Sequence, residues 1–131
     1  MNEPNIQAEP NPGHAALSVL VVDDHPAFRS SARRLLESEG YFVVGEAEDG
    51  RSALERAESL QPDLVLLDIQ LPDIDGFEVA RELKQAQSHA LVVLISSRDE
   101  ADYGSAIAES GARGFIPKGE LSGPALARML A

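Results

Sequence analysis

The 131-residue chain contains no cysteine, and this absence removes three kinds of chemistry at once. Without thiols there is no disulfide framework, no thiolate zinc site and no cysteine nucleophile. The chain also lacks any apolar run close to the roughly 18 residues that a membrane-spanning helix requires. Its N-terminus does not have the basic segment followed by an apolar segment that is typical of a secretion signal. We therefore expect a cytoplasmic protein that does not act in a membrane.

Basic residues are also scarce. Eleven Lys and Arg residues stand against 22 Asp and Glu residues, which leaves a formal net charge of −11 at pH 7. A chain this acidic repels the phosphate backbone of nucleic acids, so we expect no direct nucleic-acid binding by this chain. The excess of carboxylates is compatible with solubility alone, or with a local acidic site that binds a cation.

The first 16 residues differ in composition from the rest of the chain. They contain three prolines, three asparagines and two glutamates, with almost no large apolar side chain. Such a composition cannot bury enough apolar surface to fold. We expect a disordered leader over residues 1–16 and one folded domain over residues 17–131.

Short apolar runs alternate along the domain with segments whose apolar residues recur at helical spacing. The runs expected to form strands are Leu17–Val22, Tyr41–Val44, Leu64–Leu67, Ala90–Ile95 and Phe115–Ile116. This alternation indicates an α/β domain with a parallel sheet and helices on both faces. A doubly wound, five-stranded sheet fits this length better than an eight-stranded barrel, which needs about 250 residues.

Residues between the apolar runs predict where helices begin and which faces they bury. Asp24 is a candidate N-cap for the first helix. The second helix is expected to present Leu60 to the core, together with three other apolar residues. A weaker fourth helix is predicted from about Asp99 to Ser110. In it, Tyr103 and Ile107 are equally compatible with the core and with a patch that faces a partner.

The run that ends on Asp68 is the most informative of the five. Its four apolar residues show no alternation, which indicates a strand buried on both faces. Right-handed connections place the carboxyl ends of all parallel strands along one edge of the sheet. In the order 2-1-3-4-5, strands one and three are neighbours at the switch point where α/β sheets bind ligands. Asp23 and Asp24 are therefore expected opposite Asp68, with Ser96 and Lys118 along one side.

The residue types at this edge are suited to phosphoryl transfer. Three carboxylates in one pocket repel one another unless a cation lies among them, and oxygen ligands without His or Cys indicate Mg²⁺. Lys118 and the hydroxyl of Ser96 can bind phosphoryl oxygens. Asp68 would then carry the phosphoryl group as an acyl phosphate.

Five segments, in this order, resemble the receiver domain of two-component response regulators. They are Val-Leu-Val-Val-Asp-Asp-His-Pro (19–26), Pro-Asp-Leu-Val-Leu-Leu-Asp-Ile (62–69), Leu-Pro-Asp-Ile-Asp-Gly (71–76), Ser96, and Gly-Ala-Arg-Gly-Phe-Ile-Pro-Lys (111–118). The resemblance covers nearly all of the chain from about Ser18 and implies the CheY-like, flavodoxin-like fold. The first segment, with Val-Val-Gly-Glu-Ala (43–47), is most similar to NarL/FixJ-type receivers, which usually precede a helix-turn-helix domain.

The resemblance implies a role for each residue around the acidic pair. Asp68 would accept a phosphoryl group from a sensor histidine kinase or a phosphotransfer protein. Asp24, Asp68 and the backbone carbonyl of Gln70 would bind Mg²⁺, with Asp23 acting through a water molecule. His25 is a loop histidine followed by proline, and we expect it to be exposed and not catalytic.

Further roles are implied for residues on the other side of Asp68. Lys118 and Ser96 would stabilise the phosphoryl group. Ser96 and Phe115 would form the switch pair, in which the hydroxyl moves to a phosphoryl oxygen and the ring enters the space that it leaves. Gln70 and Arg98 would tune the phosphoryl lifetime. A homodimer through the face made by helix four, strand five and helix five is an expectation of the family.

Several alternatives stay open at this point. The chain is compatible with a free-standing receiver and with the receiver part of a truncated NarL/FixJ-type DNA-binding transcriptional regulator. A Mg²⁺-dependent phosphatase with an aspartate nucleophile would have a second aspartate where Gln70 stands. A phosphorylation-independent interaction module would not need the acidic pair. Two residues depart from the family pattern, because Pro117 precedes Lys118 and Gly119 stands where many receivers have proline.

Overall fold

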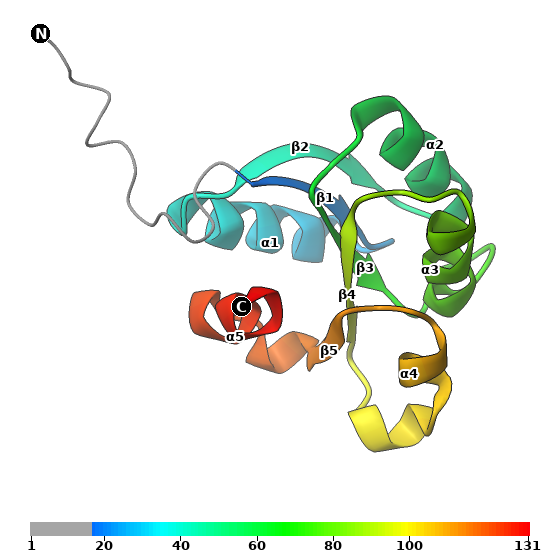
Figure 1. The fold of residues 1–131 in the computed structure, drawn as a ribbon. Coiled ribbons are helices and arrows are strands. Elements are labelled where there is room, and N and C mark those ends of the chain that lie inside the picture. Colours follow the sequence, from blue (N-terminus) through cyan, green and yellow to red (C-terminus); the bar gives the residue numbers. More distant parts are fainter. Residues whose placement is uncertain (1–16) are drawn as a thin grey trace, which may run out of the picture.

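The computed structural model describes residues 17–131, and the leader expected over residues 1–16 lies outside the described residues. The described part contains a five-stranded sheet in the order β2-β1-β3-β4-β5, with all neighbouring strands parallel (Figure 1). The strands are β1 (Ser18–Val22), β2 (Phe42–Ala47), β3 (Leu64–Asp68), β4 (Leu91–Ser96) and β5 (Gly114–Pro117). The predicted doubly wound α/β fold and its strand order are confirmed.

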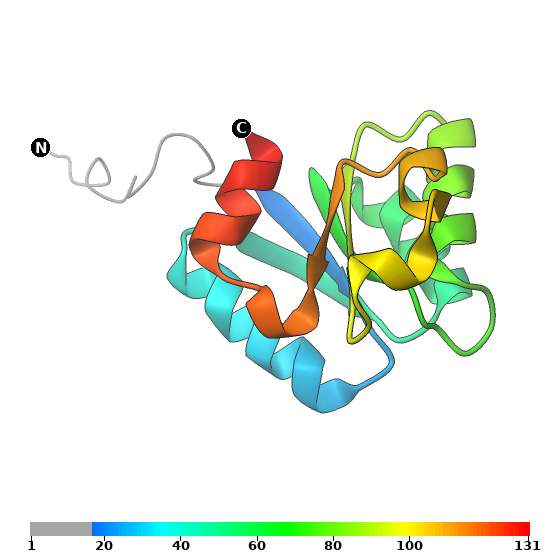
Figure 2. The same cartoon turned by 90° about the horizontal axis from the view of Figure 1, so that it is seen from below.

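Helices cover both faces of this sheet. The α-helices are α1 (Pro26–Ser38), α2 (Gly50–Leu60), α3 (Gly76–Gln85), α4 (Ala106–Glu109) and α5 (Gly123–Leu130). Two short 3₁₀ helices are η2 (Glu100–Tyr103) and η3 (Lys118–Glu120). Helices α1 and α5 lie on one face, and α2, α3 and α4 lie on the other (Figures 1 and 2). No helix in residues 17–131 is long and apolar enough to cross a membrane.

The central strand β3 contributes to the cores on both faces. Leu64 and Leu66 belong to the core that includes residues of α1 and α5, whereas Val65 and Leu67 belong to the core beneath α2 and α3. All four side chains are fully buried, which explains why the strand lacks a polar alternation. Asp68 is therefore the end of a strand that is packed on both faces.

The first helix begins differently from the prediction. Asp24 is not its N-cap, because His25 occupies that position and makes no side-chain capping hydrogen bond. Pro26 is the first helical residue and has no N–H group to be capped. The carboxylate of Asp24 is directed instead to a cluster of acidic groups at the edge of the sheet.

Two predictions about helices were wrong. Leu60 is 40% exposed, because it is the last residue of α2 and lies beyond the buried Ala53 and Ala57. The single helix predicted over residues 99–110 is divided into η2 and the four-residue α4. Between them, Gly104 has φ +58° and ψ −130°, a conformation that residues with a Cβ rarely adopt and that no helix can contain.

Candidate functional site

Asp68 is the last residue of β3, and its surroundings restrict it closely. The residue is 2% exposed, and its Oδ1 accepts a hydrogen bond from the backbone N–H of Gln70 at 3.1 Å. Gly76, at the start of α3, lies against the backbone of the strand end. A Cβ at Gly76 would lie 2.5 Å from the carbonyl oxygen of Asp68, so only glycine fits this approach without a shift of the backbone.

The carboxylates that follow β1 lie close to the carboxylate at the end of β3, as predicted. Asp23, Asp24, His25 and Asp68 offer potential ligand atoms that all lie within 4.8 Å of one another. Strands β1 and β3 are neighbours, which brings the turn after Val22 next to Asp68. Asp23 is fully buried, whereas Asp24 is partly exposed.

His25 is exposed, as expected, but it also contacts both members of the acidic pair. Its side chain is 69% exposed, and its Nδ1 lies 3.1 Å from Asp23 Oδ1 and 3.1 Å from Asp24 Oδ1. The sequence places His25 beside these residues without indicating that its ring turns back towards them.

Lys118 reaches the site from the end of β5. Its Nζ lies 2.6 Å from Asp23 Oδ2 and 3.4 Å from Asp68 Oδ2. The same ammonium group lies 4.6 Å from the centre of the Phe28 ring on α1, within the range of a cation–π interaction. The sequence does not indicate this contact between Lys118 and Phe28. One cation is thus shared by two buried carboxylates, and it lies closer to Asp23.

Burial raises the pKa of Asp68 to about 6. The backbone N–H of Gln70 opposes this rise, the negative charge of Asp23 adds to it, and Lys118 opposes it. Burial acts to lower the pKa of Lys118, but hydrogen bonding to Asp23 and the charge of Asp68 outweigh burial and raise it. Lys118 therefore stays protonated, whereas an additional cation is needed to stabilise the ionised form of Asp68 fully.

The carboxylates fit the ligand preferences of Mg²⁺. Oδ1 of Asp24 is buried and accepts no hydrogen bond within residues 17–131; its ion-pair neighbour is His25 Nδ1. Carboxylate oxygens are hard ligands, and Mg²⁺ usually takes one or two of them and keeps several water molecules. The partial exposure of Asp24 leaves the cluster accessible to such waters.

Ser96, the last residue of β4, is fully buried and binds two groups. Its Oγ accepts a hydrogen bond from the backbone N–H of Arg98 at 3.0 Å and lies 2.6 Å from the hydroxyl oxygen of Tyr103. The Tyr103 ring meets the buried ring of Phe115 edge-on, with centroids 6.0 Å apart. The two expected switch residues are thus connected through Tyr103, which the sequence left undecided between core and surface.

Gln70 and Arg98 occupy equivalent places beside the site. Each donates its backbone N–H to the side chain two residues earlier, Asp68 or Ser96, and each has an exposed side chain. Because their side chains are exposed, both residues lie at the rim of the site. The resemblance to receiver domains implies that residues at these two positions tune the phosphoryl lifetime.

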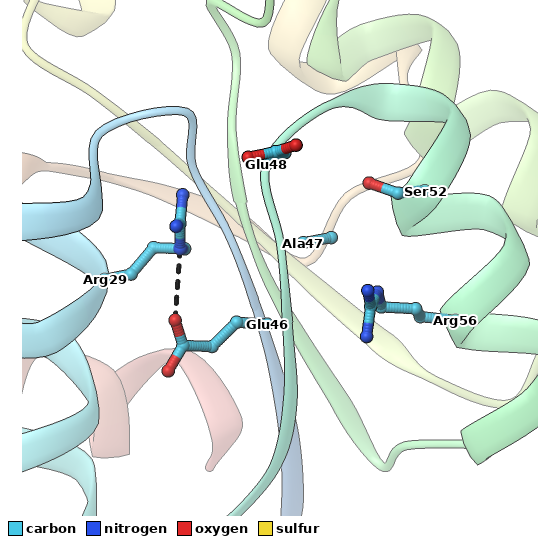
Figure 3. A pocket seen from close by; sticks show the side chains of 6 residues that line it. All are labelled: Arg29, Glu46, Ala47, Glu48, Ser52 and Arg56. Carbon is cyan, nitrogen blue, oxygen red and sulfur yellow. Dashed lines mark hydrogen bonds and ion pairs between the residues drawn. The ribbon is translucent and has the colours of Figure 1, made fainter.

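A hollow of about 240 Å³ next to α1, β2 and α2 is lined by none of the expected site residues (Figure 3). On its wall, Arg29 Nε donates to Glu46 Oε1 at 3.0 Å, and Arg29 Nη1 donates to the backbone carbonyl of Asp23 at 2.7 Å. Arg33 also donates to Glu46, at 2.8 Å. This ion-pair group supports the turn that carries Asp23, and we assign the hollow no part in the chemistry.

Comparison with known proteins agrees with this geometry. The model of the response regulator receiver domain family matches residues 19–129. The DNA-binding transcriptional activator EvgA of Escherichia coli (strain K12) is 32% identical over 104 residues, which cover 79% of this chain and 51% of that protein. The chain spans about half the length of the curated relatives that it matches.

Solved structures give the same result. The signal receiver domain of NarL from Mycobacterium tuberculosis has a TM-score of 0.79 and 37% identity, over 88% of this chain and 97% of that chain. A chain of the CheX-CheY-BeF3-Mg²⁺ complex from Borrelia burgdorferi has a TM-score of 0.78 and 25% identity, over 88% and 87%. The chain therefore belongs to the response regulator receiver domain family and is a receiver domain of the two-component type, related to NarL-type regulators.

Proposed function

We propose that this receiver is a phosphorylation-controlled switch in which Asp68 accepts a phosphoryl group from a sensor histidine kinase or a phosphotransfer protein in the cytoplasm. One observation carries the proposal. The carboxylate of Asp68 lies at a strand end, 3.4 Å from the ammonium of Lys118 and within 4.8 Å of ligand atoms from Asp23 and Asp24. The switch comprises residues 17–131, with residues 1–16 as a leader outside it.

Mg²⁺ is held by the carboxylates of Asp24 and Asp68 and the backbone carbonyl of Gln70, with Asp23 acting through water. The buried, hydrogen-bond-free oxygen of Asp24 supports this assignment, as does the Mg²⁺ named with the similar Borrelia complex. The bound ion offsets the charge of the carboxylates and of the phosphoryl oxygens.

In the transfer step, an oxygen of Asp68 attacks the phosphorus of a phosphohistidine. The new O–P bond forms as the P–N bond breaks, and the leaving imidazole nitrogen keeps the electron pair and takes up a proton. Lys118 pairs with one phosphoryl oxygen, and the Ser96 hydroxyl donates to another. Gln70 and Arg98, at the rim, set how readily water reaches the acyl phosphate, and so set the rate of self-dephosphorylation.

The added group brings about −1.5 to −2 charges to Asp68, which is 2% exposed. Moving a two-state switch from mostly off to mostly on requires about 5.5 kcal/mol of differential interaction. A single charge-assisted hydrogen bond from Ser96 supplies roughly 1.5–3 kcal/mol of this. Lys118, the metal ion and movement of the Phe115 ring supply the remainder, together with dimer formation.

The output of the switch is proposed to be DNA binding by a separate domain of a longer regulator. Two observations favour this: EvgA is named a DNA-binding transcriptional activator, and the chain spans about half of such relatives. A phosphatase is disfavoured because residue 70, where an acid/base carboxylate would stand, is the exposed Gln70.

Mass spectrometry after treatment with Mg²⁺ and acetyl phosphate tests the assignment of Asp68. We expect one phosphoryl adduct on the wild-type protein and none on Asp68→Asn. Asp75→Asn is a matched control, because Asp75 caps α3 and asparagine caps equally well. An adduct that persists in Asp68→Asn would refute the proposal, and so would multiple turnovers of a phosphomonoester by the wild-type protein.

A further inference from the structure

The hydroxyl of Ser96 is hydrogen-bonded to Arg98 and Tyr103 in this structure and not to the proposed phosphoryl acceptor. A serine hydroxyl has one donor and two acceptor positions. In Ser96 the oxygen accepts from the N–H of Arg98 and contacts the hydroxyl of Tyr103 at 2.6 Å. Within residues 17–131, Ser96 Oγ makes no hydrogen bond to Asp68 or Lys118.

Tyr103 is aimed at Ser96 by the packing of its ring. The ring lies edge-on between Phe77, with centroids 5.5 Å apart, and Phe115, with centroids 6.0 Å apart. Either hydroxyl can be the donor in this contact, and in both cases the contact fixes the Ser96 side chain towards Tyr103. The backbone N–H of Arg98 and the hydroxyl of Tyr103 thus hold the Ser96 oxygen next to η2, whose last residue is Tyr103.

The segment that carries Tyr103 is short and weakly held. It consists of the 3₁₀ helix η2, Gly104 and the four-residue α4, beside the end of β4 (Figure 2). Short 3₁₀ turns have poor hydrogen-bond geometry, and segments with few buried contacts move at low free-energy cost. Gly104 has open space where a Cβ would lie, so the packing around it does not fix the segment.

We infer that Tyr103 is a positioning residue that holds Ser96 in its unphosphorylated position and gives up this contact when Asp68 is phosphorylated. This inference rests on the proposed role of Asp68. To reach a phosphoryl oxygen, the Ser96 hydroxyl must leave the 2.6 Å contact, or η2 must follow it. Either movement transmits the change from Asp68 to residues 100–109. Phe115 has no hydroxyl and cannot hold Ser96 in this way.

The variant Tyr103→Phe removes the hydroxyl and keeps the ring between Phe77 and Phe115. The affinity for beryllium trifluoride in Mg²⁺, a stable analogue of the phosphoryl group, is measured by two-dimensional NMR titration. We expect Tyr103→Phe to bind roughly two- to tenfold more tightly than the wild type, since the competing hydrogen bond is gone. Tyr41→Phe is the matched control, because Tyr41 is the other tyrosine of the chain and is expected to leave the affinity unchanged.

A second readout follows Tyr103 directly. With ¹³C-labelled tyrosine rings the chain gives signals from two tyrosines, and Tyr41→Phe identifies those of Tyr103. The Tyr103 signals should shift when the wild-type protein is saturated with beryllium trifluoride, and also in unliganded Ser96→Ala. A merely structural tyrosine would not respond to both changes.

The outcomes separate this inference from the proposed function. If the wild type binds beryllium trifluoride, but Tyr103→Phe binds no more tightly or the Tyr103 signals stay fixed, the positioning role is refuted and the role of Asp68 stands. If the wild type neither binds the analogue nor forms an adduct at Asp68, the positioning role of Tyr103 and the proposed role of Asp68 are both refuted.

Discussion

At the scale of single residues, the site places two like charges close together on side chains with little exposure to solvent. Asp68 and Asp23 are both almost fully buried, and they share the ammonium of Lys118 at 3.4 Å and 2.6 Å. Such an arrangement costs stability in the absence of a further cation. The same excess of negative charge would make the site bind Mg²⁺, and the bound ion would in turn favour the phosphoryl group.

The pH dependence of unfolding should reveal this cost. The pKa of Asp68 is about 6 in the folded protein against 3.8 for the unperturbed group, so the folded state binds more protons between these values. Stability is therefore lost as the pH rises from about 4 to about 6, and the loss is complete above that range. With Mg²⁺ chelated, we expect Asp68→Asn to raise the free energy of unfolding above pH 7 by about 1–3 kcal/mol.

Urea unfolding of Asp68→Asn and the wild-type protein at several pH values measures this effect. The advantage of the variant should shrink as the pH falls through 6 and disappear below about pH 3, where the wild-type carboxyl group is protonated in both the folded and the unfolded state. An advantage that is constant with pH, or a variant less stable than wild type above pH 7, would contradict the assigned cause.

At the scale of elements, the loop from β3 to α3 determines where the Asp68 backbone lies. The carboxylate of Asp73 accepts hydrogen bonds from the N–H groups of Gly50, at 2.7 Å, and Arg51, at 2.9 Å, and so binds the start of α2. Gly76 closes the loop, with its N–H donating to the carbonyl of Ile69 at 2.8 Å. The loop is thus attached to α2 through Asp73 and closed at its ends by the bond between Gly76 and Ile69.

Gly76→Ala should disturb this element and the site together. The added methyl group would lie 2.5 Å from the carbonyl oxygen of Asp68 and 2.8 Å from Cα of Ile69, so the backbone has to move. We expect the free energy of unfolding to fall by about 1–3 kcal/mol and phosphorylation by acetyl phosphate to slow. Denaturant unfolding and the initial rate of adduct formation are the measurements.

Gly119→Ala is the matched control for this prediction. A Cβ at Gly119 meets no atom within 4 Å, and the residue does not have a positive φ. Its stability should stay within about 0.5 kcal/mol of wild type. If Gly76→Ala were as harmless as Gly119→Ala, close backbone packing could not be what holds Asp68.

At the scale of the whole molecule, the switch has to alter a surface that a second protein can bind. The proposed surface is formed by α4, β5 and α5, which follow Tyr103 in the chain and lie together at one side of the molecule (Figures 1 and 2). Both helices are short, with four residues in α4 and eight in α5.

Sedimentation velocity of the protein with and without Mg²⁺ and beryllium trifluoride tests dimerisation through this surface. We expect the mass to increase towards that of a dimer when the analogue binds, and Asp68→Asn to show no increase. Equal masses for the liganded and unliganded wild-type protein would exclude phosphorylation-driven dimerisation.

Much of this molecule could be predicted from local pattern alone. The gathering of Asp23, Asp24, Asp68 and Lys118 at one edge follows from alternating apolar runs and from the right-handed connection of parallel strands, and the strand order is the common one for a five-stranded sheet of this kind. Local readings failed at the Asp24 cap and at Leu60, and also in the alanine-rich stretch before Ser110, which has helical spacing although Gly104 interrupts it with a positive φ. Glycine is compatible with both a helix and a turn, so the residue alone did not decide between them.

The sequence by itself thus determined the fold, the edge at which the site lies and the carboxylate on which the chemistry centres, because these depend on periodicities repeated along the chain. Only the tertiary structure decided that Lys118 lies nearer Asp23 than Asp68, that Phe28 covers its ammonium group, and that Tyr103 holds Ser96. These contacts join side chains from different elements, and sub-ångström differences in how the helices pack on the sheet decide which partner each side chain meets.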